Sequence, residues 1–371
     1  SKIILATDPD REGEAIAWHV KEYLNEKKLI KDKHVERVVF NEITKKAVIH
    51  GIENPRQIEP LLVDAYMARR ALDYLVGFNI SPILWTKLPG SKSAGRVQSV
   101  ALKLITEREH EIELFDPEEF WTLSVQFNDN DKNSILASIT QLNDKKIEKF
   151  SFKNKAEIDK AIEEVKSKKF NINDISSKVV NRNPSGPFTT STLQQVSSGR
   201  LGFGASRTMQ IAQKLYQGIE IDGETIGLIT YMRTDGTNLS TDAIDTFRKY
   251  IKNEFGDEYV PDNAASYSGK KAKNAQEAHE AIRPTDIMRA PDTVKKYLSP
   301  DQHKLYDLIW SRALSSQMKP AQFDRNTITI TSDDNGTICK ASGSVIKFDG
   351  FLKVMKDTKK DDDEDILPEM N

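Results

Sequence analysis

The spacing of apolar and polar residues divides the chain into recognisable helix and strand segments. Short runs of β-branched and apolar residues predict a fully buried strand at residues 2–7 and another strand of the same sheet at residues 36–40. A helical pattern follows the first strand, and a longer one covers residues 57–76. The apolar positions of the longer helix are Leu61, Ala65, Ala68, Leu72 and Leu75. This pattern indicates a parallel α/β domain that leads into a helical domain.

From residue 120 the pattern changes to alternating strands. They are expected at residues 120–126, 134–142, 170–175, 326–330, 338–342 and 345–348, with a charged helix near 155–166. The last three strands are expected to rejoin the first three in one scaffold. Between the two groups, polar-faced helices at 189–200 and 206–217 precede a strand that carries Tyr231, an order similar to a winged helix.

Composition changes of this kind predict a multi-domain α/β plus α+β protein in five parts. The predicted parts are 1–53 (α/β), 54–115 (helical), 116–185 (β-rich), 186–318 (winged-helix-like, with Tyr231) and 319–371 (β-rich, with an acidic tail).

The composition is that of a globular protein without a disulfide framework. Of 371 residues, 38% are apolar and 30% charged, and the single cysteine excludes a multi-cysteine zinc site. No run approaches the roughly 18 apolar residues of a membrane span. With a single cysteine, Cys339, a reducing cytoplasm is the expected setting. The chain opens at Ser1 inside a strand-like run, and we expect it to be part of a longer protein.

The net charge of −2 hides two basic windows. No acidic residue occurs between Asp73 and Glu107 or between Asp174 and Glu220, although both intervals contain several Lys and Arg residues. These windows predict local anion-binding surfaces, with chance clustering as the alternative.

Three carboxylates, Asp8, Asp10 and Glu12, follow the first strand. In open α/β sheets ligands collect at the carboxyl ends of strands, and Mg²⁺ prefers carboxylate oxygens. The acidic loop therefore predicts a magnesium site, and an acidic cap on the next helix is the alternative.

A second candidate site lies where the strand at residues 223–230 ends. A tyrosine hydroxyl titrates near pH ~10, so Tyr231 needs a nearby cation or hydrogen bond to act as a nucleophile. Arg233 lies two residues on and could steady a phenolate or hold a phosphate; simple packing of Tyr231 is the alternative. His279 and Arg283 are predicted to share one face of a short helix that Pro284 ends.

Four segments in one order carry a family resemblance: residues 8–19 (DPDREGEAIAWH), 93–99 (SAGRVQS), 228–235 (LITYMRTD) and 278–286 (AHEAIRPTD). Together they closely resemble the bacterial topoisomerase I group of type IA DNA topoisomerases, over about residues 1–355. The resemblance implies a toroid of a Toprim α/β domain, helical and winged-helix-like domains and a β-rich arch.

The implied activity is relaxation of negatively supercoiled DNA without ATP. By this resemblance Tyr231 attacks a phosphodiester of a single-stranded segment, forms a 5′-phosphotyrosine, and religation follows strand passage. A topoisomerase III-like decatenase, a Toprim nuclease or primase, and a non-catalytic single-strand binding module are the alternatives. A monomer in the bacterial cytoplasm, at the nucleoid and away from membranes, is expected.

The resemblance also implies roles for individual residues. Arg233 would hold the scissile phosphate, His279 would lie near it, and Asp8, Asp10 and Glu12 would bind Mg²⁺. The implied single-strand groove consists of Arg69, Arg70, Asp73, Phe78, Trp85, Ser93, Ala94, Gly95, Arg96, Val97 and Gln98, with Arg233. Basic residues beside aromatic surfaces suit such a groove.

Two departures from the family pattern bear on activity. The family's Toprim domain begins before the position of Ser1, with a strand that bears a glutamate, and further segments follow the position of Met355. The isolated chain is therefore expected to bind single-stranded DNA without relaxing supercoils.

Overall fold

The structure is a computed structural model that describes residues 2–128, 134–267 and 280–355. The chain forms two compact units. The first contains Ser1–Phe115, Pro187–Leu239 and Tyr267–Trp310, and the second contains Asp116–Gly186, Ser240–Ser266 and Ser311–Asn371. Each unit is described by itself below.

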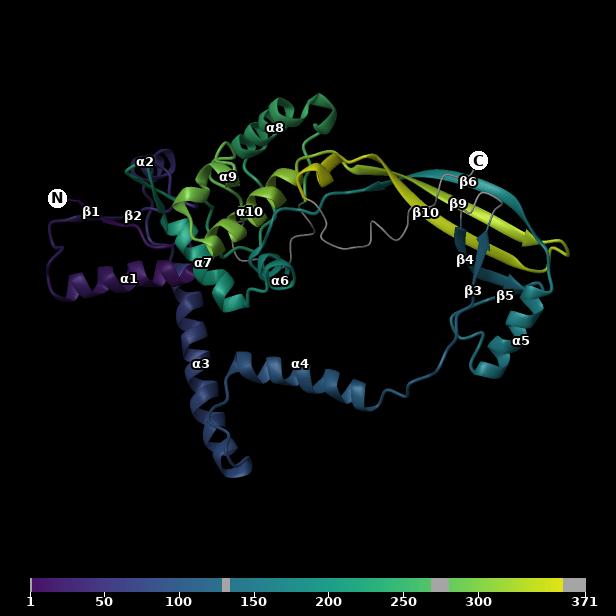
Figure 1. The fold of residues 1–371 in the computed structure, drawn as a ribbon. Helices are drawn as coiled ribbons and strands as arrows, with labels where there is room; N and C mark the ends of the chain where they lie inside the picture. Colours follow the sequence, from purple (N-terminus) through teal and green to yellow (C-terminus); the bar gives the residue numbers. More distant parts are fainter. Residues whose placement is uncertain (1, 129–133, 268–279, 356–371) are drawn as a thin grey trace. The chain divides into compact units, whose positions relative to one another are not determined.

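The first unit begins with a small parallel sheet (Figure 1). Strand β1 (Lys2–Leu5) pairs with β2 (His34–Arg37), helix α1 (Arg11–Glu26) connects them, and α2 (Lys45–Glu53) follows. The prediction that the first strand is fully buried is wrong, because Lys2 and Ile4 are exposed while Leu5 is buried. Successive side chains point to opposite faces of a strand, and one face of this sheet is open in the described residues.

Two long helices follow. The predicted helix at 57–76 continues as α3 (Pro60–Lys87), with Pro82 inside it. Helix α4 (Arg96–Glu113) has no buried residue within the described chain. The apolar stripe predicted for α3 is exposed as well, with Leu61 at 75% and Leu75 at 56%. Periodicity thus located the helices correctly without revealing what covers them.

The tyrosine-bearing part of the first unit is built from short elements. In chain order they are α6 (Thr190–Leu201), α7 (Ala205–Gln217), β7 (Ile219–Ile221), β8 (Glu224–Ile226), α9 (Pro291–Val294) and η2 (Lys295–Tyr297). Helix α10 (Pro300–Ser315) follows. A capping box between Thr189 and Thr192 begins α6. Side chains such as Phe188, Leu193 and Leu228 are fully buried beneath these elements.

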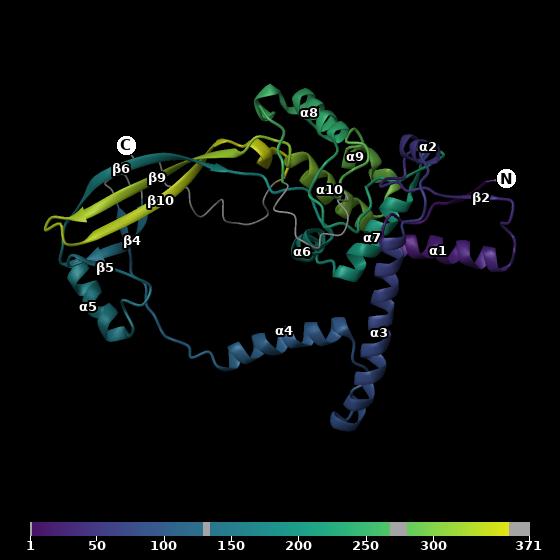
Figure 2. The ribbon, with the colours of Figure 1, turned by 180° about the vertical axis from the view of Figure 1, so that it is seen from behind.

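The second unit contains an antiparallel sheet in the order β3-β4-β10-β9-β6, with β5 (Lys145–Lys146) beside β4. The strands are β3 (Ser124–Asn128), β4 (Ser134–Leu142), β6 (Phe170–Arg182), β9 (Ala321–Ser332) and β10 (Ile338–Phe348). Figure 2 shows β6, β9 and β10 side by side. The prediction that residues beyond 320 rejoin the earlier strands is confirmed.

Helix α5 (Lys155–Lys166) contributes Ile158, Ala161 and Val165 to the core of this sheet. The unit also holds α8 (Thr241–Phe255), capped by Ser240, and η1 (Asp257–Tyr259). The strands predicted at 338–342 and 345–348 form the single strand β10, and a single turn, η3 (Gly350–Lys353), follows it. Among the described residues, none of the helices is both long and apolar enough to cross a membrane.

Candidate active site

The segment that carries Tyr231 is fixed by backbone hydrogen bonds to several separate segments. Strand β8 ends at Ile226, so the prediction of one strand running to Tyr231 is wrong. Beyond it, the Thr230 amide donates to the carbonyl of Arg283 (2.9 Å) and the Tyr231 amide donates to that of Asn41 (2.8 Å). Partners from distant segments, rather than one neighbouring strand, hold the tyrosine in place.

The side chain of Tyr231 is buried and directed at the acidic loop. It is 2% exposed and makes an edge contact with Tyr216, with ring centroids 5.2 Å apart. Its hydroxyl donates to Oδ2 of Asp10 at 2.6 Å, and Nη1 of Arg233 lies 3.7 Å from the same oxygen. The structure thus brings together the predicted nucleophile, its arginine and one predicted metal ligand.

The environment of Tyr231 favours the protonated phenol. Burial raises the pKa of Tyr231 well above its usual range, and the bond to Asp10 and the charges of Asp10 and Asp8 add to that effect. The charge of Arg233 acts in the opposite direction. Forming the phenolate therefore requires a proton acceptor or an added cation.

Asp10 serves both as helix cap and as site residue. Its Oδ1 accepts the Gly13 amide at 2.8 Å at the start of α1. A Cβ on Gly13 would lie 2.1 Å from the carbonyl oxygen of Asp8, so only glycine lets the loop fold back this closely. The capping alternative and the site are therefore compatible, because the cap uses only one carboxylate oxygen.

Asp8 and Asp10 repel each other. Burial raises the pKa of Asp8, and the charge of Asp10 raises it further, although Arg233 and Arg37 lower it. A bound cation would relieve this repulsion, so the two carboxylates fit a divalent ion with oxygen ligands.

Glu12 does not face the other two carboxylates. Its Oε1 accepts from Nη1 of Arg69 at 2.6 Å and from Nε of Arg11 at 3.4 Å. Across residues 2–128, 134–267 and 280–355, no group of three or more His, Cys, Asp or Glu side chains is arranged to hold a metal. Glu12 would have to leave Arg69 to complete the predicted ligand set.

A buried ionic network beneath the loop was not predicted from the sequence. Arg37 is fully buried and donates to the carbonyls of Leu5 (3.1 Å), Thr7 (2.9 Å) and Asp8 (2.6 Å). It also donates to Glu14, which is itself fully buried. The network therefore holds the backbone of the acidic loop. The one sequence signal for it is an arginine within a predicted strand, which is an uncommon position for a charged residue.

Glu14 is further held by Arg56. Both guanidinium nitrogens Nη1 and Nη2 of Arg56 donate to the carboxylate at 2.8 Å, and the Glu59 amide donates at 2.7 Å. Burial would raise the pKa of Glu14, but these bonds outweigh burial and lower it.

The predicted groove residues form a chain of ion pairs on α3 and α4. Arg96 donates to Asp73 at 2.5 Å and 3.3 Å, and Nε of Arg69 lies 4.0 Å from the same carboxylate. Since Arg69 also pairs with Glu12, the ion pairs link the acidic loop to the start of α4.

The other groove residues lie along the same two helices. Phe78 stacks near Tyr74, with ring centroids 4.5 Å apart, and Trp85 donates to the carbonyl of Lys92 at 2.7 Å. The Ala94 amide donates to Ser81, and Gly95 precedes α4 without a side-chain cap. Arg70 lines a surface hollow together with Met67 and Tyr74. Val97 is 63% exposed. Ser93 and Gln98 lie close to Gly95 in the sequence, on either side of it.

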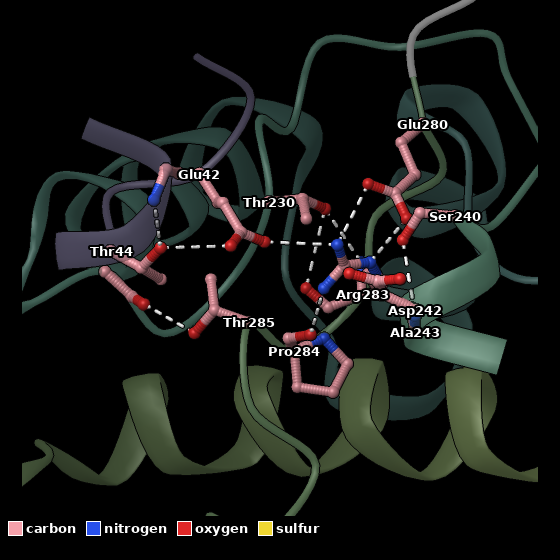
Figure 3. Close-up of polar contacts among 12 residues, drawn as sticks. Glu42, Thr44, Thr230, Ser240, Asp242, Ala243, Glu280, Arg283, Pro284 and Thr285 are labelled. Carbon is pink, nitrogen blue, oxygen red and sulfur yellow. Dashed lines mark hydrogen bonds and ion pairs between the residues drawn. The ribbon is translucent and has the colours of Figure 1, made fainter. Parts of the chain in front are cut away.

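His279 lies outside the described residues. The helix predicted around it does not extend over residues 280–284, where isolated bridges pair Ile282 with Phe188 and Pro284 with Ile229. The prediction that Arg283 lies on a helix face is therefore wrong. The proline-ended stretch is extended, and the guanidinium of Arg283 is buried beside Glu280 and Glu42 (Figure 3).

The sequence profile of the family described as DNA topoisomerase matches residues 57–371, and that of the Toprim domain matches residues 1–43. The chain belongs to the type IA DNA topoisomerase family. The mixed helix-and-sheet fold and the acidic loop at the end of β1 agree with this family, and Toprim domains are generally metal-binding.

Relatives within the topoisomerase family share the whole length of the chain. DNA topoisomerase 1 of Rickettsia felis is 53% identical over 98% of this chain and 47% of its own length. That of Zymomonas mobilis subsp. mobilis is 49% identical over 98% of this chain and 29% of its own. Full-length topoisomerase I of Thermotoga maritima has a TM-score of 0.78 at 40% identity, covering 95% of this chain and 55% of that one. The chain thus spans about half the length, or less, of the relatives it matches.

Proposed function

We propose that this chain is the cleavage core of an enzyme that relaxes negatively supercoiled DNA through transient cleavage of one strand. The observation that supports this proposal most directly is the contact of the buried Tyr231 phenol with Asp10, with Arg233 beside it. A tyrosine used only for packing does not need a carboxylate bonded to its hydroxyl and an exposed guanidinium beside that carboxylate.

In the proposed step, Oη of Tyr231 attacks the phosphorus of a phosphodiester. The Oη–P bond forms while the bond from phosphorus to O3′ breaks, and the departing O3′ takes a proton from water, which leaves a 5′-phosphotyrosine and a 3′-hydroxyl. Asp10 Oδ2 is placed to accept the phenol proton, because it already accepts that hydrogen bond at 2.6 Å. Arg233, 58% exposed, is available to bind the phosphate oxygens.

Religation reverses these bonds, so the phosphotyrosine stores the energy of the cleaved bond and the reaction needs no ATP. Mg²⁺ held by Asp8 and Asp10 would supply positive charge near the phosphate and the 3′ side. Arg69, Arg70 and Arg96, with Phe78 and Trp85, would bind the single strand beside the site. We expect the protein to act as a monomer at the bacterial nucleoid, with His279 near the scissile phosphate.

The test is to incubate the full-length protein with an end-labelled single strand and then denature the mixture. A covalent adduct joined to the 5′-phosphate at the break, detected with a label at the 3′ end of the strand, supports the proposal. Single-strand binding without any adduct would instead assign a non-catalytic binding module. Efficient unlinking of DNA circles with little relaxation would favour a topoisomerase III-like decatenase.

A further inference from the structure

The guanidinium of Arg283 lies in the interior of the first unit, where it is 7% exposed. Its Nε and Nη2 donate to the two carboxylate oxygens of Glu280 at 2.6 Å and 2.9 Å. Nη2 also donates to Glu42 at 3.1 Å, and Nη1 donates to the carbonyl of Pro284 at 3.0 Å (Figure 3). Burial alone would lower the pKa of Arg283, but these carboxylates outweigh burial and raise it, so the group is a permanent cation.

The backbone of Arg283 holds the residue before Tyr231. Its amide donates to Oγ1 of Thr230 at 3.0 Å, and its carbonyl accepts the Thr230 amide at 2.9 Å. The Thr230 hydroxyl in turn donates to the carbonyl of Ala281 at 2.8 Å. Thr230 is 1% exposed, so these bonds are shielded from water and fix its position.

The side chain of Arg283 holds residues 41–42, the segment that accepts the Tyr231 amide. Glu42, which it binds, directly follows Asn41, whose carbonyl accepts the Tyr231 amide at 2.8 Å. The other oxygen of Glu42 accepts the hydroxyl of Thr44, the N-cap of α2, at 3.0 Å. The segment that receives the Tyr231 amide is therefore held through the carboxylate of Glu42.

We propose that Arg283 is a positioning residue for Tyr231: its buried guanidinium joins segments 41–42 and 280–284, and its backbone binds Thr230. It does not touch the reacting atoms. Its contribution is to fix the backbone of Thr230 and Tyr231 from both sides, so that the phenol stays directed at Asp10. The proposal rests on Tyr231 being the nucleophile, as set out above.

The planar shape of the guanidinium is essential to this role. A fork of N–H donors binds Glu280 with two bonds and still reaches Glu42, whereas a lysine ammonium is a compact point charge on a flexible stem. Loss of the fork leaves at least one carboxylate poorly paired in the interior. The Tyr231 segment then gains freedom, and misplacement of a catalytic group by about 1 Å can cost on the order of 10²-fold in rate.

The experiment compares Glu42→Gln and Arg283→Lys with the parent, both in the full-length protein. Glu42→Gln keeps the size of the side chain and removes only the charge, so it tests the inference even if Arg283→Lys fails to fold. The matched control is Asp257→Asn, which removes the exposed ion pair with Lys252 at 2.7 Å in the second unit. Three quantities are measured for each variant: amide hydrogen exchange of residues 228–234, the single-turnover rate of adduct formation, and the Kd for a labelled single strand.

The expected result is faster exchange at the Thr230 and Tyr231 amides and a roughly 10-fold to 10²-fold slower adduct rate. The Kd should stay within about twofold of the parent, since neither residue lies in the groove, and the control should match the parent in all three measurements. Parental exchange and adduct rates in Glu42→Gln, or in a folded Arg283→Lys, would overturn the inference. If the parent itself forms no adduct, the proposed function fails, while the exchange measurement still decides whether Arg283 fixes the segment.

Discussion

The hydroxyl of Tyr231 donates a 2.6 Å hydrogen bond to Asp10, a residue 221 positions earlier in the chain. One oxygen of Asp10 caps α1 while the other receives the phenol, so the start of that helix and the tyrosine segment fix the same carboxylate. Because burial and the two aspartates keep the phenol protonated, the arrangement holds the proposed nucleophile in its neutral form beside the proposed proton acceptor. Binding of DNA or of a cation would then favour the phenolate and its attack on phosphorus.

Replacing Tyr231 by phenylalanine should abolish covalent adducts. The variant loses only the hydroxyl, so the buried ring and its edge contact with Tyr216 remain. Affinity for single-stranded DNA should stay near that of the parent, measured by fluorescence anisotropy beside a denaturing-gel cleavage assay. Adducts at the parental level would show that another side chain is the nucleophile.

Replacing Asp10 by asparagine keeps its role as the cap of α1 and removes its charge, so the two roles can be tested separately. Asparagine caps helices about as well as aspartate, so α1 should keep its stability to within a few tenths of a kcal/mol. The proton acceptor and one predicted ligand of the cation are lost, however, so adduct formation should slow by at least about 10²-fold at neutral pH. The variant should also respond less to added Mg²⁺. If the variant forms adducts at the parental rate and with the parental Mg²⁺ dependence, other residues accept the proton and bind the cation.

The sequence predicted the residues that meet at the candidate site better than the connections between segments. Asp8, Asp10, Tyr231 and Arg233 were identifiable because polar groups at the ends of apolar runs are expected to face ligands. The partners of those residues could not be predicted, because the bonds from Tyr231 to Asn41 and from Arg37 to the acidic loop join segments far apart in the chain.

Helix and strand positions were also mostly predictable from periodicity. The exceptions have physical causes. The helix predicted at 57–76 continues through Pro82 to Lys87, and the stretch before Pro284 was predicted to be helical although tertiary bridges hold it extended. Local patterns cannot report such tertiary contacts.

Two substitutions in the predicted single-strand groove should have opposite effects on the affinity for single-stranded DNA. Asp73 pairs with Arg96 and lies 4.0 Å from Arg69, so it competes with phosphate for both cations. Asp73→Asn should raise single-strand affinity at low salt, whereas Arg96→Ala should lower it and reduce the slope of log K against log salt by roughly 0.7. Arg108→Ala, which removes an exposed pair with Glu111 near the end of α4, is the control. Equal slopes in all three variants would place the DNA on another surface.

Arg37→Met should destabilise the first unit strongly. Glu14 would lose a buried partner, and the carbonyls of Leu5, Thr7 and Asp8 would lose their donor, so a cost of about 3–5 kcal/mol is expected. Arg56→Met is the matched control, since Arg56 is 37% exposed and should cost less. Urea unfolding followed by circular dichroism measures both. Equal losses of stability would mean that burial of Arg37 does not decide its contribution.

Cys339 allows a test of the second unit that does not depend on catalysis. Cys339 lies on β10, the strand between β4 and β9, where it is fully buried, and burial raises the pKa of its thiol to about 11. In the unfolded chain the pKa should be near ~8.5, so the folded state holds the proton more tightly. Its contribution to stability is therefore complete below about pH 8.5 and is lost as the pH rises towards 11. At pH 8 the folded protein should react with a thiol reagent only at the rate at which this sheet opens, whereas protein in urea should react at once. A native rate equal to that in urea would show that the sheet does not enclose Cys339.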